Sequence, residues 1–374
     1  GLRAGQTITL RHAEELNEDG TLYRDTLRGA AQTDTYIASG RENGAVYCPT
    51  FTYHGFRYCA VEGLDYLDRD AITAELWCTD LRTASHFSCG NALVTKLHDM
   101  VVMTEMDNMH SILTDCPQRD ERMGWMNDAT VRFEETPYNF DISRMFPKLI
   151  RDLRAEQTKA DDGAITCTAP FIWGGRPADP VCSSYLIAGY ETWLHRGNLA
   201  ILAESFDGFA AWEDCLLHRS VDYIVDYSYY GDWAGPAYAC LSPEAAQSGV
   251  TDGKLMSTGY SYLNCRLLVK MAKLLGREAD AEKYQEIGEK VRAAYLAKWL
   301  NAETGVVERG SQGAQAFSLW LGIVPEEVRE KAAAVLVADL VARNFAITTG
   351  NLCTRYLFDA LFTYGYTEEA WRVL

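Results

Sequence analysis

The chain has 374 residues, of which 48% are hydrophobic and 23% charged, with a net charge of −17 and an isoelectric point near 4.9. This composition is typical of a globular protein with a large core, and the length suits two or three domains or one large domain with a smaller one. The acidic balance argues against nucleic acid and anionic membranes as partners, because both need a basic surface. The sequence has no apolar run of about 18 residues, so no transmembrane helix is expected.

Eleven cysteines are scattered singly along the chain, and none forms a Cys-x-x-Cys pair, so no zinc site is expected. We interpret them as buried reduced thiols, with a disulfide framework as the alternative. Reduced thiols and the lack of a visible signal peptide predict a cytoplasmic protein. Because the chain begins at Gly1, we expect its start to be missing, and a signal peptide before it stays open. We expect no cofactor, and we predict no oligomeric state.

Residues 1–83 are predicted to form part of a β-sandwich domain that is truncated at its N-terminus. Short segments rich in β-branched and aromatic residues alternate with a period near two, and an Asn43–Gly44 pair indicates a turn between two of them. The expected strands are residues 8–12, 36–38, 51–61 and 74–78.

Residues 84–374 change to a helical period, and we expect roughly ten helices there. The apolar stripe that runs from Leu263 to Leu275 stops before Gly276, and Pro325 opens a later helix. Short and long connections alternate, and the long ones carry the Gly, Pro, Trp and acidic residues. This arrangement predicts an α/α toroid. The last segment, residues 367–374, begins as a helix, and we expect the toroid to be incomplete at the C-terminus.

Residues 114–128 are the most informative segment, because they combine four carboxylates, two arginines and a tryptophan. Carboxylates at close quarters push their pKa values apart, which is how a site obtains one protonated acid and one ionised partner near neutral pH. The tryptophan adds a flat apolar face that suits a sugar ring. The alternative is a salt-bridged loop, in which Arg119 and Arg122 neutralise the acids. Pro117 and Gly124 favour a loop that enters a helix over one continuous helix, which would put Glu121 and Asp128 on one face.

This segment closely resembles the signature of bacterial α-L-rhamnosidases, Asp-Cys-Pro-x-Arg-x-Glu-Arg-x-Gly-Trp-x-x-Asp. The resemblance covers essentially the whole chain. It implies a mainly α fold, an (α/α)6 six-hairpin toroid preceded by part of a β-sandwich. It also implies the hydrolysis of terminal α-L-rhamnose, with inversion, from a rhamnose-containing glycoside or oligosaccharide. The other similar segments are residues 5–14 and 52–58 in the β domain and residues 230–233, 257–260, 312–319 and 348–350 in the toroid.

The resemblance also implies site residues. Glu121 resembles the general acid, and we expect the ionised carboxylates of Asp115 and Asp128 to raise its pKa and keep it protonated. The implied sugar contacts are Asp115, Arg119, Trp125, Asp128, Asp232 and Trp233. Trp125 resembles a wall of the rhamnose pocket, and Trp233 an apolar surface near the sugar's methyl group. Asp232 has the alternative of a structural turn aspartate.

Two departures from the family matter. The family's general base is a glutamate further along the chain, and we expect it beyond Leu374, because Glu368 and Glu369 are placed to cap a helix. The fragment itself is therefore expected to hydrolyse slowly or not at all. Val181 stands about where many relatives have a pocket tryptophan, and Trp173 either compensates for it or belongs to the core.

Two other functions stay open from the residues. One is another toroid glycosidase or a polysaccharide lyase that uses the same carboxylates, although a lyase acting on an anionic chain generally has a basic cleft. The other is a non-catalytic protein that binds sugars through its aromatic and acidic residues. His54, His98, His110 and His195 show no metal-ligand spacing, and we interpret most of them as structural.

Overall fold

The computed structural model describes residues 2–41, 44–242 and 244–374, and the chain divides into two compact units, residues 1–124 and 125–374. Each unit is described by itself. The first holds a small sheet, the helix α1 (Ala92–Asp107) and the loop that follows it. The domain boundary expected after residue 83 stays a prediction.

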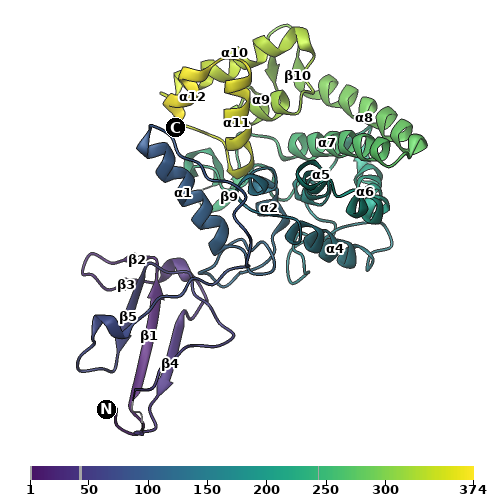
Figure 1. Cartoon of the computed structure of the whole chain (residues 1–374). Helices are drawn as coiled ribbons and strands as arrows, with labels where there is room; N and C mark the ends of the chain where they lie inside the picture. The colour runs from purple at the N-terminus through teal and green to yellow at the C-terminus, as the bar shows by residue number, and fades with distance from the viewer. Residues whose placement is uncertain (1, 42–43, 243) are drawn as a thin grey trace. The chain divides into compact units, whose positions relative to one another are not determined.

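A three-stranded antiparallel sheet is the centre of the first unit (Figure 1). Its middle strand β1 (Thr7–Ala13) pairs with β4 (Thr33–Ile37), Thr9 facing Thr35, and with β5 (Tyr58–Glu62), Arg11 facing Ala60. β-branched residues in β1 suit this pleated, half-buried position. His12 and Ala13 at the end of β1 are buried.

The predicted strands agree with this sheet in part. The strands expected at residues 8–12 and 36–38 are confirmed, the second displaced toward the N-terminus, and that at 51–61 forms only over its last residues. The strand expected at residues 74–78 is wrong: this segment is coil, with Leu76 and Trp77 exposed and no strand beside it in the described chain. Apolar side chains alone do not make a strand without a pairing partner. Asn43 of the expected turn lies outside the described residues.

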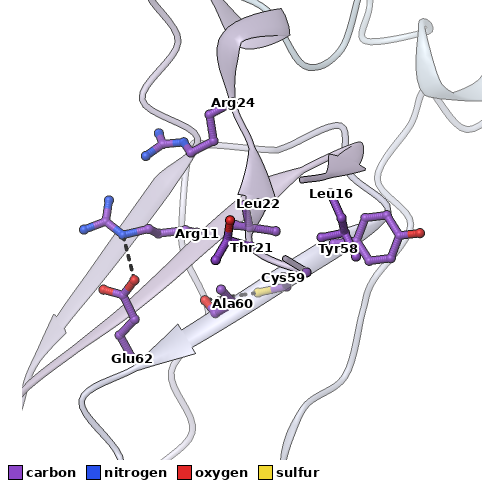
Figure 2. A pocket seen from close by; sticks show the side chains of 10 residues that line it. Arg11, Leu16, Thr21, Leu22, Arg24, Tyr58, Cys59, Ala60 and Glu62 are labelled. Atoms are coloured by element: carbon purple, nitrogen blue, oxygen red, sulfur yellow. Dashed lines mark hydrogen bonds and ion pairs between the residues drawn. The ribbon is translucent and has the colours of Figure 1, made fainter. Parts of the chain in front are cut away.

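A shallow pocket of about 590 Å³ lies over the sheet beside the hairpin of β2 (Glu15–Leu16) and β3 (Leu22–Tyr23) (Figure 2). Arg11 of β1 reaches across to Glu62 of β5 there, with Nε 3.1 Å from Oε1. None of the candidate site residues lines this pocket.

The second unit is a ring of helices (Figure 1). Contacts join α2 to α5, α5 to α7, α7 to α9, α9 to α11 and α11 back to α2, while α4, α6, α8 and α10 pack against members of this ring. The alternation of ring and partner helices confirms the predicted toroid arrangement. The helices are α2 (Met126–Arg132), α3 (Thr136–Asn139), α4 (Met145–Gln157), α5 (Ser184–Arg196), α6 (Leu199–His218), α7 (Gly253–Leu274), α8 (Glu278–Trp299), α9 (Gln312–Trp320), α10 (Glu326–Ala342), α11 (Asn351–Thr363) and α12 (Thr367–Val373).

Short elements connect these helices. The two-stranded pairs are β6 (Ser220–Val221) with β7 (Ile224–Val225), β8 (Cys240–Ser242) with β9 (Ala245–Ser248), and β10 (Leu300–Asn301) with β11 (Val306–Val307). The 3-10 turns are η1 (Asp25–Leu27), η2 (Arg69–Ala71), η3 (Pro180–Cys182) and η4 (Ala237–Ala239).

The ends of the long helices follow from local chemistry. The Asp252 side chain accepts a hydrogen bond from Lys254 N–H at the start of α7, and Gly276 beyond its end has φ +68°, which favours glycine. Pro325 precedes the first turn of α10, as predicted, and Glu326 and Glu327 meet the positive end of its dipole.

All eleven cysteines are free, which agrees with the expected reduced thiols, although Cys48, Cys59 and Cys89 are exposed and not buried. In the described part of the chain, no helix combines the length and the apolar character that a membrane crossing requires.

Candidate active site

Residues 114–124 form a closed loop in the first unit. The Asp115 N–H donates to the Met123 carbonyl at 3.0 Å, and the Asp115 carboxylate accepts from the Met123 N–H at 2.9 Å. The helix α2 begins only at Met126. The predicted loop that enters a helix is therefore confirmed, and Glu121 does not share a helix face with Asp128.

This loop gathers two carboxylates and a thiol. One ligand atom each of Asp115, Cys116 and Glu121 lies within 4.8 Å of the others. Arg119 Nη2 lies 3.7 Å from Asp115 Oδ2 and 3.5 Å from Glu121 Oε2. The Asp115 side chain is 4% exposed and that of Glu121 27%, so Glu121 is the member of the pair that a ligand can reach.

Two polar atoms of the loop are buried without a hydrogen-bond partner in the described structure, Asp115 Oδ2 and Arg119 Nε. Buried polar atoms in native proteins are nearly always bonded, so orphans of this kind mark places where a ligand or water binds. Both atoms belong to the carboxyl loop, and they fit the hydroxyl groups of a sugar, which donate as well as accept.

Arg28, which follows η1 in the β region, completes the cluster and was not foreseen. Its Nη2 lies 2.9 Å from Glu121 Oε1 and 2.8 Å from Asp120 Oδ1, and the neighbouring Gly29 N–H donates to Asp120 at 3.1 Å. A Cβ at Gly29 would lie 2.9 Å from the Asp120 carboxylate, so the close approach suits glycine. No local sequence pattern identifies Arg28, because its partners are about 90 positions away.

The two carboxyls divide one proton unequally. Burial, and then the neighbouring Glu121 carboxylate, raises the pKa of Asp115 to about 7. The Asp115 side chain, and then the Arg28 and Arg119 guanidiniums, lower the pKa of Glu121. The expectation that an ionised Asp115 keeps Glu121 protonated is therefore wrong for this structure: the proton rests on Asp115. The two titrate as a pair, which holds its one proton up to about pH 7.

Aromatic side chains gather in the second unit. Trp125 meets Trp173 edge-on at 5.6 Å and Tyr230 at 5.8 Å between ring centroids, and Tyr230 meets Trp233 at 5.2 Å. Trp125 is buried, and Trp173 is 63% exposed, which contradicts a core role for it. Edge-to-face rings of this kind present flat apolar surfaces. The structure thus brings Trp125 and Trp233 into one aromatic group.

Asp232 is buried, and both of its carboxylate oxygens are already used. Oδ2 accepts from the Gly350 N–H at 2.7 Å and Oδ1 from the Cys353 N–H at 2.9 Å, which fixes the start of α11. A direct contact with a sugar is therefore not supported, and the structural alternative is favoured.

The predicted site residues divide between the units. Asp115, Arg119 and Glu121 are brought together in the first, and Trp125 and Trp233 in the second. Asp128 lies half-buried in the first turn of α2.

Val181 is fully buried in η3, next to Asp179. The Asp179 carboxylate accepts hydrogen bonds from the backbone N–H groups of Tyr229 and Tyr230, the latter at 2.8 Å. Sequence reasoning missed this aspartate, which holds the loop that carries Tyr230.

Comparison with known proteins adds an independent result. Residues 82–374 match the family described as the bacterial alpha-L-rhamnosidase 6 hairpin glycosidase domain, and residues 1–77 match the bacterial alpha-L-rhamnosidase concanavalin-like domain. An alpha-L-rhamnosidase of Streptomyces avermitilis is 32% identical over 373 residues, covering 99% of this chain and 35% of the relative.

Solved structures agree. The alpha-L-rhamnosidase from Dictyoglumus thermophilum superposes with a TM-score of 0.92 at 35% identity, over 99% of this chain and 41% of that chain. The crystal structure of the Streptomyces avermitilis alpha-L-rhamnosidase complexed with L-rhamnose superposes with a TM-score of 0.91 at 31% identity, over 99% and 35%. The chain spans between 35% and 40% of the length of the curated relatives that it matches.

Proposed function

The chain belongs to the bacterial α-L-rhamnosidases, and from this we propose that the protein hydrolyses terminal α-L-rhamnose from glycosides or oligosaccharides with inversion. The observation that carries the proposal is the carboxyl pair of Asp115 and Glu121 beside Arg119, with a proton held near pH 7 and with orphaned polar atoms. A relative of this chain was crystallised with L-rhamnose, which supports that sugar as the ligand.

The proposed chemistry begins with the shared proton. An inverting glycosidase needs a carboxylic acid that protonates the leaving oxygen and a base that activates water, about 6.5–9.5 Å apart. We assign the acid to Glu121, because it is the more exposed member of the pair. Asp115 stores the proton that Glu121 transfers, and both orient the sugar with Arg119. We assign no residue of this chain as the base.

We propose the aromatic group of Trp125, Tyr230 and Trp233 in the second unit as an apolar contact for the sugar. Rhamnose is a deoxy sugar, and its methyl group and C–H faces suit flat aromatic surfaces. Asp128 is proposed as a further hydroxyl contact at the start of α2.

The test is an assay of the protein, expressed from its complete coding sequence, on a panel of p-nitrophenyl glycosides. Turnover of the α-L-rhamnoside is expected, and Glu121→Gln should lower kcat by about 10²–10⁴-fold, the usual contribution of a general acid. Glu204→Gln is the matched control, because Glu204 also pairs with an arginine, Arg151, at 2.8 Å, but belongs to a partner helix.

Three outcomes would contradict parts of the proposal. Near wild-type activity of Glu121→Gln would exclude Glu121 as the acid. Turnover of another glycoside with none of the rhamnoside would exclude the substrate. Binding of L-rhamnose by calorimetry without any turnover would favour the sugar-binding protein over the enzyme.

A further inference from the structure

Arg122, the residue after Glu121, ties the carboxyl loop to the β region of the first unit. Its Nη1 donates to the Tyr53 carbonyl at 2.9 Å, its Nη2 to Gln32 Oε1 at 2.9 Å, and its Nε to the Arg119 carbonyl at 3.1 Å. The guanidinium also lies over the Tyr53 ring, 4.9 Å from its centroid. The planar fork of arginine serves three acceptors at once, which a lysine ammonium does not do in this geometry.

The backbone at Arg122 needs such an anchor. Its φ is +52°, in the left-handed region that a residue with a Cβ seldom adopts. A strained conformation persists only where the surroundings hold it. Without its side-chain bonds Arg122 would relax toward negative φ, and this rotation would move Glu121 directly before it.

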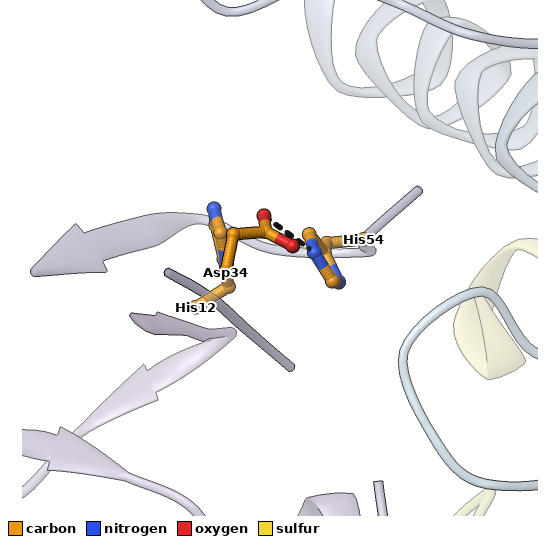
Figure 3. Close-up of side chains that lie close together, drawn as sticks. All are labelled: His12, Asp34 and His54. Carbon is orange, nitrogen blue, oxygen red and sulfur yellow. Dashed lines mark hydrogen bonds and ion pairs between the residues drawn. The ribbon is translucent and has the colours of Figure 1, made fainter. Parts of the chain in front are cut away.

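The Gln32 side chain links Arg122 to a histidine, His54. Its Nε2 donates to the Gly55 carbonyl at 2.9 Å, so its Oε1 is the atom that faces Arg122. The same Oε1 contacts His54 Nδ1, and His54 Nε2 lies 2.9 Å from Asp34 Oδ2 (Figure 3). Both ring nitrogens of His54 are therefore engaged by oxygen atoms.

His54 and Asp34 lie in a buried cluster. The two side chains are only 12% and 11% exposed, and His12 stacks on His54 with ring centroids 4.4 Å apart. The titratable and charged groups that face His54 are Asp34 from β4, the His12 ring from β1 and, through Gln32, Arg122. Packing and hydrogen bonds fix the His54 ring, and the ring in turn fixes the Gln32 side chain.

The same cluster has a second reading as a metal site, since donor atoms of His12, Asp34 and His54 lie within 4.8 Å of one another. A metal would need a lone pair from His54, but both of its nitrogens contact oxygens. The two imidazoles are also stacked, with planes 21° apart (Figure 3). The hydrogen-bonded arrangement is favoured.

We propose that Arg122 is a positioning residue for Glu121, and that His54, held by Asp34, keeps Arg122 in place through Gln32. The assignment rests on the proposed role of Glu121 as the acid. Without the His54 ring, Gln32 loses one of the contacts that fix its side chain, and its hold on Arg122 weakens.

Activity is tested first, in the protein expressed from its complete coding sequence. Arg122→Gln should lower kcat by about 10²-fold with KM within a few-fold, the cost of misplacing a reacting group by about 1 Å. Arg122→Lys should recover only part of the loss. His54→Gln should lower kcat by less than Arg122→Gln does, because Arg122 keeps its bonds to the Tyr53 and Arg119 carbonyls. Glu62→Gln, an exposed carboxylate on the same sheet, is the control that should change nothing.

One readout does not depend on turnover. Carbon-13 NMR of the carboxyls should show the joint titration of Asp115 and Glu121 displaced in Arg122→Gln and unchanged in Glu62→Gln.

The outcomes separate the two proposals. A wild type without any glycosidase activity would contradict the proposed function, while the NMR experiment still decides the network. An unchanged carboxyl titration with wild-type kcat in Arg122→Gln would overturn the positioning role. Stoichiometric binding of Zn²⁺ that is lost in His54→Ala would overturn the hydrogen-bonded network and favour the metal.

Discussion

Two buried carboxyl sites of this molecule differ in their partners. In the first unit, Asp115 lies beside Glu121, and two arginines face the pair. In the second unit, Glu213 is buried among neutral donors: the Ser261 hydroxyl at 2.5 Å, the Asn264 amide at 3.0 Å and, at 3.6 Å, the Cys265 thiol.

Burial raises the pKa of both, that of Asp115 to about 7 and that of Glu213 to about 8. A raised pKa therefore does not by itself mark a catalytic acid. The difference lies in the neighbours. Asp115 lies beside Glu121, whose carboxylate is more exposed, and beside two arginines, whereas Glu213 has no exposed carboxylate to which it could pass its proton. The four predictions that follow test this distinction.

The largest effect is expected at Asp232, a buried carboxylate of the second unit that holds backbone and not substrate. Asp232→Ala should lower the free energy of unfolding by about 2–6 kcal/mol, because two buried N–H donors at about 1–3 kcal/mol each lose their acceptor. Urea denaturation measures this. Asp226→Ala, an exposed position, should leave stability unchanged. Equal stability of Asp232→Ala and the wild type would refute the structural role.

Asp115→Asn should lower the rate on an aryl rhamnoside by about 10²-fold at pH 7, within the range of general acid catalysis. The variant lacks the carboxyl whose pKa is raised to about 7, and the remaining Glu121 lies beside Arg28 and Arg119, which lower its pKa. The alkaline limb of the pH–rate profile should therefore move to lower pH. A limb that stays in place would show that the pair does not share the proton.

Glu213→Gln should stabilise the protein at pH 7 by about 1–3 kcal/mol and leave activity unchanged. Folding raises the pKa of Glu213 from 4.5 to about 8, so the wild type loses stability as pH rises between these values. The glutamine variant has no such loss, and the two should be equally stable near pH 4. Denaturation at a series of pH values measures the stability of both proteins. If their stabilities changed with pH in parallel, a raised pKa of Glu213 would be excluded.

The smallest effect is expected at Arg28, which helps to lower the pKa of Glu121. Arg28→Gln should move the alkaline limb upward by less than about one pH unit, because partly exposed ion pairs contribute about 0–1 kcal/mol. Arg11→Gln removes a comparable exposed pair on β1 and should leave the limb in place. A downward movement would contradict the assigned direction.

How much the sequence predicts depends on the range of the interactions. Helix ends at Gly276 and Pro325 follow from local chemistry and were predicted. The loop of Asp115 and Glu121 was also predicted, because its residues are adjacent in sequence. The strand expected at residues 74–78 failed, because strands need a partner that local pattern does not supply.

The site residues that were not predicted come to the site through contacts between positions that are far apart in the sequence. Arg28 reaches Glu121, and Gln32 reaches Arg122, across about 90 positions. The protonation of Asp115 was reversed for the same kind of reason, since burial and the Arg28 charge come from the fold and are absent from the motif. For Asp232 the motif left a sugar contact and a structural turn aspartate open, and only the fold shows the backbone N–H groups that it accepts from.

The ion pair between Arg28 and Glu121 has a consequence for folding during synthesis and for unfolding on heating. Arg28 leaves the ribosome long before its partner, so the site is assembled only after the β strands and the later loop have both emerged. Local unfolding of the small sheet would remove this arginine while the helices stay intact. On heating, activity should therefore fall before the helical circular dichroism signal does.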